Sequence, residues 1–192
     1  MNNFTLIRSG IDISPFRDEL LRNDAAWQFD TSRRDKLACQ RETEAIILRK
    51  YDRSKGGNPM DTHESCIARA FPYFPVATTW LEATASLLGG DLGRALFAML
   101  RPRGQVYRHI DRGEYYAVRR RYHLVIVSAG GSLMKCGKEE NVMQEGELWE
   151  FDNKLPHEAF NHSDHARIHL IFDLHHGDQP KSKPIDTRAS HV

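Results

Sequence analysis

The sequence predicts a mainly β fold, a barrel or sandwich of short strands with helices on its outside. Beyond about residue 93, short segments rich in β-branched and aromatic residues alternate with Gly- and Asp-rich turns. The helical patterns lie upstream of these segments. No internal repeat or low-complexity stretch interrupts the 192 residues, so we expect one domain with a single core.

The first 92 residues mix helices with a strand. Ser14 precedes a proline and should be the N-cap of a helix over residues 14–23. Residues 43–49 form an apolar run of strand length, and residues 54–59 have the composition of a loop. Apolar positions recur at helical spacing over residues 76–88, where two glycines follow and predict the end of the helix.

The second half carries the predicted β core, which we place at about residues 93–176. A charged turn is expected at residues 137–141, and residues 177–192 read as a polar tail of the same single domain. The expected strands lie within residues 94–101, 122–128, 134–136, 147–151 and 168–174.

Composition excludes several classes of partner. The chain has 27 basic and 26 acidic side chains, so no global charge favours nucleic acid or an anionic membrane. No apolar run approaches the roughly 20 residues that cross a bilayer, and the N-terminus lacks the pattern of a secretion signal. Cys39, Cys66 and Cys136 are odd in number and widely spaced, which suits free thiols in the cytoplasm. The oligomeric state is not indicated.

Three residues form a candidate metal site, the metal triad: His109, Asp111 and His157. Residues i and i+2 of a strand point to the same face, so His109 and Asp111 can converge on one ion. His157 must then arrive from another strand. Two imidazoles and one carboxylate suit Fe(II) and leave coordination positions open, although the same set would accept Mn, Co or Zn.

Two predicted strands each point an arginine and a histidine to one side. Arg167 and His169 share a face of the last strand, and Arg121 and His123 share a face of an earlier one. Arginine suits bidentate recognition of a carboxylate. A barrel with two inward arginines is expected to take a dicarboxylate or an acidic substrate.

Several motifs in one order resemble a known family. They are RHIDRG at 108–113, RYHL at 121–124, GELWEFDN at 146–153, LPHEA at 155–159 and RIHLIFD at 167–173. Together they look like the aspartyl/asparaginyl β-hydroxylases, which are Fe(II)/2-oxoglutarate dioxygenases with a double-stranded β-helix core (jelly-roll, cupin-like). The motifs are also similar to bacterial proline hydroxylases.

The resemblance implies a role for each of these residues. The metal triad would hold catalytic Fe(II), and the co-substrates would be 2-oxoglutarate and O2. Arg167 would pair with the outer carboxylate of 2-oxoglutarate, and Arg121 with His123 would lie near its oxalyl end. The implied reaction is hydroxylation of an unactivated C–H bond, with release of succinate and CO2.

Two positions depart from the pattern of the family. Animal aspartyl hydroxylases have glycine where Asp111 stands, so the carboxylate here favours iron binding but weakens transfer of that branch's substrate. Ala98 stands where some relatives have a hydroxyl that assists the outer carboxylate. The halogenating oxygenases replace the carboxylate ligand with a small residue, so Asp111 indicates hydroxylation.

The substrate is open at this stage. The resemblance favours an aspartyl or asparaginyl side chain of a peptide or protein. A free amino acid such as proline and a natural-product intermediate are alternatives. A non-catalytic cupin that senses a metal or a dicarboxylate, or a structural or interaction module, would be a different class of protein. Candidate substrate contacts are Gln40, Arg41, Thr43 and His169.

Overall fold

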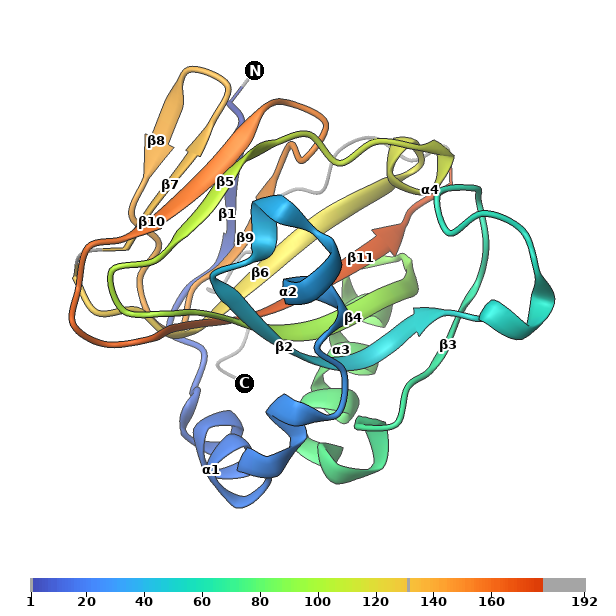
Figure 1. The fold of residues 1–192 in the computed structure, drawn as a ribbon, viewed down its shortest axis with the longest axis horizontal. Helices are drawn as coiled ribbons and strands as arrows, with labels where there is room; N and C mark the ends of the chain where they lie inside the picture. The colour runs from blue at the N-terminus through green and yellow to red at the C-terminus, as the bar shows by residue number, and fades with distance from the viewer. Residues whose placement is uncertain (1, 131, 178–192) are drawn as a thin grey trace, which may run out of the picture.

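The chain folds into two antiparallel sheets that face each other, with helices around them (Figure 1). The computed structural model describes residues 2–130 and 132–177. Between the sheets, Val125 and Phe151 of the larger sheet pack in one apolar cluster with Met134 and Cys136 of the smaller sheet. No helix of these described segments is long and apolar enough to cross a membrane.

The larger sheet has seven strands, and its central strands are buried on both faces. Neighbouring strands pair antiparallel throughout. In order across the sheet they are β1 (Phe4–Arg8), β9 (Leu148–Phe151), β6 (Arg119–Val127), β11 (Arg167–His175), β4 (Asp91–Leu100), β2 (Thr43–Tyr51) and β3 (Ser65–Ile67).

The smaller sheet has four strands, in the order β5 (Gln105–His109), β10 (His157–Asn161), β7 (Ser132–Cys136) and β8 (Glu139–Asn141). From β4 onward the chain passes back and forth between the two sheets, interrupted only by the hairpin of β7 and β8. This alternation is the winding of a double-stranded β-helix, and it confirms the predicted mainly β, cupin-like class.

The helices α1 (Ser14–Arg22) and α3 (Pro75–Leu88) cover the larger sheet on the face away from the smaller one (Figure 1). Trp80 of α3 contacts the ring of Phe172 on β11 at 5.9 Å between centroids. The buried carboxylate of Glu19 on α1 accepts hydrogen bonds from the first backbone N–H groups of α3. These donors have no partner within their own helix, so Glu19 joins the two helices.

Two short helices flank the opening of the barrel. α2 (Ser32–Lys36) precedes β2, and α4 (Glu114–Ala117) lies between β5 and β6. Short 3-10 turns at Asp24–Gln28, Ala38–Gln40, Arg53–Lys55 and Phe71–Tyr73 complete the connections.

The elements follow the sequence predictions, with several differences. Ser14 is the first residue of α1 and Ile13 is its N-cap, so the predicted N-cap is wrong by one position. The expected turn at 137–141 contains β8, because its three residues pair with β7. β2 contains the apolar run predicted at residues 43–49, whereas β1, β3, β5 and β10 are additional to the expected strand segments. The predicted tail beyond residue 177 lies outside the described residues.

Candidate metal centre

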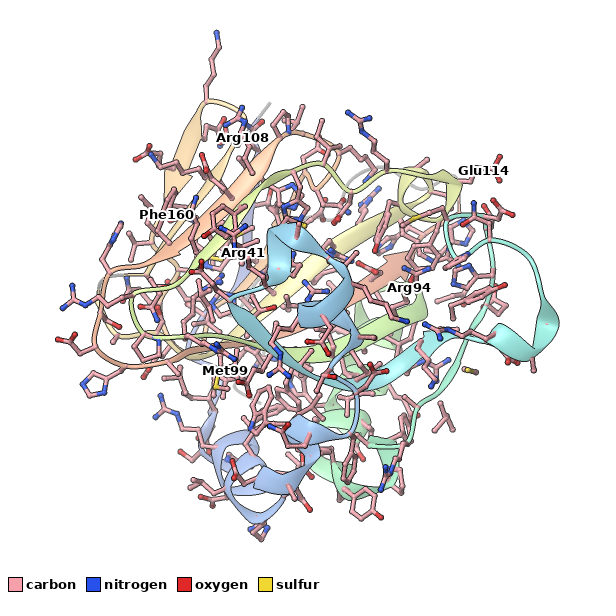
Figure 2. The ribbon with its side chains drawn as sticks, in the orientation of Figure 1. Arg41, Arg94, Met99, Arg108, Glu114 and Phe160 are labelled. Atoms are coloured by element: carbon pink, nitrogen blue, oxygen red, sulfur yellow. The ribbon has the colours of Figure 1, made fainter. Side chains whose placement is uncertain are left out.

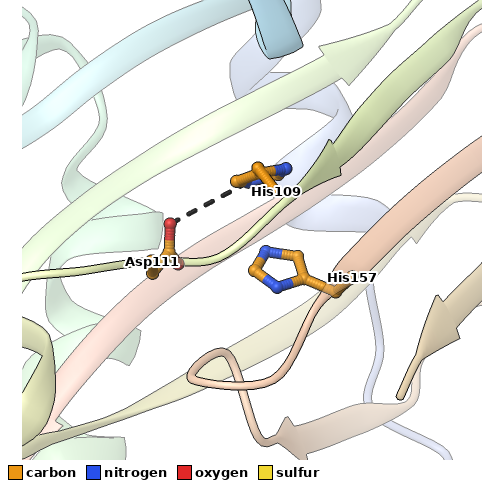
Figure 3. Close-up of side chains that lie close together, drawn as sticks. All are labelled: His109, Asp111 and His157. Atoms are coloured by element: carbon orange, nitrogen blue, oxygen red, sulfur yellow. Dashed lines mark ion pairs between the residues drawn. The ribbon is translucent and has the colours of Figure 1, made fainter.

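The two histidines of the metal triad are cross-strand neighbours. His109 is the last residue of β5, His157 is the first of β10, and the antiparallel register pairs them directly. Their rings lie 4.2 Å apart between centroids (Figure 3). Opposite residues of an antiparallel pair have close side chains, so the sheet itself brings together two imidazoles that are distant in sequence.

Backbone carbonyls orient both imidazole rings. Nδ1 of His109 lies 2.7 Å from the carbonyl oxygen of Tyr107, and Nδ1 of His157 lies 2.9 Å from that of Leu155. A carbonyl can only accept, so each Nδ1 carries the proton and each Nε2 keeps its lone pair for a metal. Burial lowers the pKa of His157 to about 4, although the charge of Asp111 opposes the shift. The neutral imidazole is the form that binds metals.

Asp111 follows β5 rather than lying within it, so the expected strand alternation does not place it. Its backbone N–H donates to the carbonyl of Asn153 at 3.1 Å. Its Oδ2 accepts from Arg121 at 2.5 Å and from Asn153 Nδ2 at 3.0 Å. Burial would raise the pKa of Asp111, but the positive charge of Arg121 and the hydrogen bond from Asn153 hold it below its usual range.

The three side chains suit a divalent metal. One ligand atom from each lies within 4.8 Å of the others. The Oδ1 of Asp111, which no donor occupies in these bonds, lies 3.9 Å from His109 Nε2 (Figure 3). Two imidazoles oriented by backbone carbonyls and one oriented carboxylate match the donor set of Fe(II) sites with open positions.

His109 and His157 line a cavity between the two sheets, and Asp111 lines an outer groove beside it. Most of the side chains predicted to bind the co-substrate or substrate lie on the wall of the cavity. Those residues are Gln40, Thr43, Arg121, His123 and Arg167, and Ala98 and Met99 of β4 lie beside them.

Arg167 is a buried cation without a carboxylate partner among the described residues. Its guanidinium donates to the ring of His169 at 3.0 Å. Burial lowers the pKa of Arg167 to about 10, so it stays charged at neutral pH. Burial and the charge of Arg167 together hold the pKa of His169 and His123 well below the usual value, so both imidazoles are neutral. The Nε2 of His123 is buried with no hydrogen-bond partner.

Arg121 lies in the cavity wall but has anionic partners from the chain. It contacts Asp111 and, through Nε at 2.8 Å and a terminal nitrogen at 3.1 Å, the buried Asp173. Burial alone would lower the pKa of Arg121, whereas the two carboxylates raise it well above the usual value. The expected place of Arg121 beside a co-substrate stays a prediction, and its observed partners assign it to the support of Asp111.

The structure separates the four candidate substrate contacts. Gln40 and Thr43 are buried in the cavity wall, and the Nε2 of Gln40 lies 3.4 Å from His109 Nε2. Arg41 does not reach the cavity, because it lies over the ring of Tyr107 with its side chain 57% exposed (Figure 2). His169 lies behind Arg167 and supports it instead of lining the cavity.

Sequence reasoning missed Arg33, on α2. Arg33 lines both the cavity and the outer groove that Asp111 lines. Its Nε is buried and has no hydrogen-bond partner, and burial lowers its pKa. The Oε1 of Gln40 is likewise buried without a partner. A charged residue on a short polar helix gives no signal of its own, because its position depends on how α2 packs against the barrel.

The segment before β3 closes over the turn that carries Asp111. The backbone of Tyr115 donates to the carbonyl of Met60 at 2.9 Å, and the ring of His63 stacks on Tyr115 at 4.7 Å. Gly113 has φ +104°, and a Cβ at this position would lie 2.7 Å from the Cβ of Met60. Glycine is therefore required on both conformational and steric grounds.

Comparison with known proteins gives one family. The family described as Aspartyl/Asparaginyl beta-hydroxylase matches residues 13–177, which include the metal triad, the cavity wall and Arg33. No curated protein matches the chain.

Solved structures share the fold at low sequence identity. A 2OG-Fe(II) oxygenase family oxidoreductase from Burkholderia pseudomallei is 11% identical, with a TM-score of 0.54 over 87% of this chain and 82% of that one. A Pseudomonas putida prolyl-4-hydroxylase is 18% identical, with a TM-score of 0.52 over 92% and 94%. A non-heme monooxygenase, the ThoJ-Ni complex, is 15% identical, with a TM-score of 0.52 over 95% and 76%.

Proposed function

Because the chain belongs to the aspartyl/asparaginyl β-hydroxylase family, we propose that it is a Fe(II)/2-oxoglutarate-dependent dioxygenase. It hydroxylates an unactivated C–H bond of an aspartyl or asparaginyl side chain in a peptide or protein. One atom of O2 enters the substrate as a hydroxyl group, and the other enters succinate as 2-oxoglutarate loses CO2.

The observation that carries this proposal is that His109 and His157 of the metal triad line the same cavity as Arg167. The triad offers two Nε2 atoms and one carboxylate oxygen to a metal. The cavity also holds a buried guanidinium that no described carboxylate neutralises. A buried charge is costly unless paired, so this arrangement supports an anionic ligand beside the metal, as a 2-oxo dicarboxylate would be.

Each part of the chain has a task in this reaction. Bound iron would supply the activation of O2. Arg167 would bind the outer carboxylate of 2-oxoglutarate by a charge-assisted contact, beside the neutral rings of His123 and His169. Asn153 and Arg121 orient Asp111, so that the ligands keep one geometry. The apolar wall of Met134, Phe151 and Ile171 limits water near the oxidising centre.

Arg33 and Gln40 support an aspartyl or asparaginyl substrate. Both lie beside His109 and carry a buried polar atom without a partner, Nε of Arg33 and Oε1 of Gln40. The Nε–H of Arg33 can donate to a carboxylate, and the Oε1 of Gln40, which only accepts, suits the NH2 group of an asparaginyl amide. Arg33, Gln40 and Asp111 line the same groove, so a side chain held by Arg33 and Gln40 would lie beside the metal triad.

A free amino acid remains the second candidate substrate. The small size of the inner cavity favours it. A non-catalytic dicarboxylate sensor differs from both candidates, because it would bind 2-oxoglutarate without turning it over.

The decisive experiment is anaerobic loading with Fe(II) and 2-oxoglutarate, followed by exposure to air with a panel of substrates. The panel contains acidic and asparagine-containing peptides, free proline and free aspartate. We expect substrate-stimulated succinate and a mass gain of one oxygen atom on a peptide. Oxygen on free proline alone would select the second candidate. Tight 2-oxoglutarate binding without succinate formation under any condition would indicate the non-catalytic sensor.

We also place the protein in the cytoplasm. Cys39, Cys66 and Cys136 are all free thiols, and a reducing compartment preserves such residues. Fractionation of the native host, probed with an antibody, tests this assignment.

A further inference from the structure

Asp173 is a buried carboxylate on β11 that does not line the cavity. It is 1% exposed, and the sheet register pairs it directly with Arg121 on β6. Its two oxygens accept from Nε and a terminal nitrogen of Arg121 at 2.8 and 3.1 Å. The hydroxyl of Tyr115 donates to it at 3.3 Å. Arg121 is therefore fixed by a two-point contact, the strongest geometry for this pair.

The contact with Asp173 leaves one terminal nitrogen of Arg121 for Asp111. That nitrogen and Nδ2 of Asn153 both donate to the same oxygen, Oδ2 of Asp111. The other oxygen, Oδ1, is left facing His109. The contacts from Asp173 to Arg121 and from Arg121 to Asp111 thus decide which oxygen of Asp111 is available to a metal.

The charges of these three side chains matter as much as their geometry. Arg121 alone would neutralise Asp111 and place a positive charge beside an incoming divalent cation. Asp173 offsets the charge of Arg121, so the pair sums to zero and the negative charge of Asp111 stays available. The effective dielectric of a buried site is low, so the net charge near Asp111 strongly affects the binding of a cation a few ångströms away.

We infer that Asp173 is a positioning residue of the metal centre. It orients Arg121 and offsets its charge, and it thereby raises the affinity of the metal triad for a divalent cation that it does not touch. This inference rests on the proposed function, because it requires a metal at the triad.

The test is the affinity of the purified protein for Mn²⁺, measured by titration calorimetry, together with the visible spectrum of the Co²⁺ form. Asp173→Asn keeps the shape of the side chain and removes its charge. We expect the Mn²⁺ affinity to fall by about 10- to 100-fold, the range found for groups that orient metal ligands. The Co²⁺ spectrum should change as Asp111 rotates.

Glu150→Gln is the matched control. Glu150 is also buried in the larger sheet, but it accepts from Tyr122 on the face covered by α3. The same neutralisation there should leave the Mn²⁺ affinity within threefold of the original protein. Circular dichroism of both variants excludes loss of the fold.

A double variant separates charge balance from simple loosening of the sheet. Arg121→Gln/Asp173→Asn removes both charges and leaves Asn153 to hold Asp111. We expect it to recover at least fivefold in Mn²⁺ affinity over Asp173→Asn alone. No recovery, or an Asp173→Asn affinity equal to that of the original protein, overturns the inference.

His157→Ala distinguishes this failure from failure of the proposed function. If the original protein binds Mn²⁺ no better than His157→Ala, then the metal triad is not a metal centre, and both proposals are wrong. If the original protein binds tightly and His157→Ala does not, an unchanged Asp173→Asn variant refutes only the positioning role.

Discussion

The two buried arginines of the cavity have different surroundings. Arg121 is held between Asp111 and Asp173, and their charges raise its pKa despite burial. Arg167 donates to the neutral ring of His169, and burial alone lowers its pKa to about 10. The Arg121 site is balanced by charges of the chain itself, whereas no carboxylate of the described residues balances Arg167. Under the proposed function, the Arg121 site supports a bound metal and the Arg167 site takes an anion from solution.

Loss of a metal ligand should have the largest effect on activity and metal affinity. His157→Ala should abolish substrate-dependent succinate formation and lower Mn²⁺ affinity by more than the roughly 100-fold typical of groups outside the ligand set. Coupled succinate assays and calorimetry measure the two effects. His162→Ala, at an exposed histidine, is the control and should behave as the original protein. Normal turnover by His157→Ala would contradict the metal assignment.

Replacing each arginine by methionine in metal-free protein should shift stability in opposite directions. Arg121→Met leaves two buried carboxylates without a cation and should lower the free energy of unfolding by about 3–5 kcal/mol. Arg167→Met removes an unpaired buried charge and should raise it by about 1 kcal/mol. Urea denaturation with a chelator present tests both. Equal destabilisation would show that the two sites do not differ in charge balance.

The Arg167 site should account for most of the affinity for the co-substrate. Arg167→Gln should weaken 2-oxoglutarate binding by about 2–5 kcal/mol, or roughly 30-fold to several thousand-fold, since the buried carboxylate loses its cation. Calorimetry with Mn²⁺ in place of iron measures this loss. Arg41→Gln changes an exposed guanidinium outside the cavity and should have no effect. Equal affinities for 2-oxoglutarate in both variants would remove Arg167 from its role.

The pH dependence of stability gives the smallest effect. Burial and the charge of Arg167 lower the pKa of His169 and of His123 well below 6.5. Below about pH 6.5 the unfolded chain binds protons that the folded chain excludes, so stability present at neutral pH is lost on acidification. His169→Gln should reduce the slope of unfolding free energy between pH 6.5 and 5 by up to about 1.4 kcal/mol per pH unit. An unchanged slope would mean that His169 is charged in the folded state.

The sequence predicted those parts of the fold and site that repeat along a strand. Strand alternation placed Arg121 and His123 on one face of their strand, and Arg167 and His169 on one face of theirs. Residue type and spacing identified His109 and His157 as candidate metal ligands. The turn after β5 could not be predicted, because Asp111 is placed by Asn153 and Arg121. These contacts follow from tertiary packing.

Residues that reach the site from elements outside the recognised motifs, or through strand pairing, could not be identified from the sequence. Arg33 reaches the cavity only because α2 packs beside β2. The partnership of Asp173 with Arg121 depends on the register of β6 and β11, and a shift of one residue would point their side chains to opposite faces. Such long-range register is not encoded in any short motif.

The fit of Met60 over Gly113 has a consequence for redesign. The backbone of Gly113 approaches Met60 without room for a side chain. The segment before β3 and the turn that carries Asp111 therefore have to be changed together. Grafting a foreign loop there to alter selectivity would have to transplant residues 110–115 along with it. Recombination that splits the pair should yield proteins that fold yet bind iron poorly.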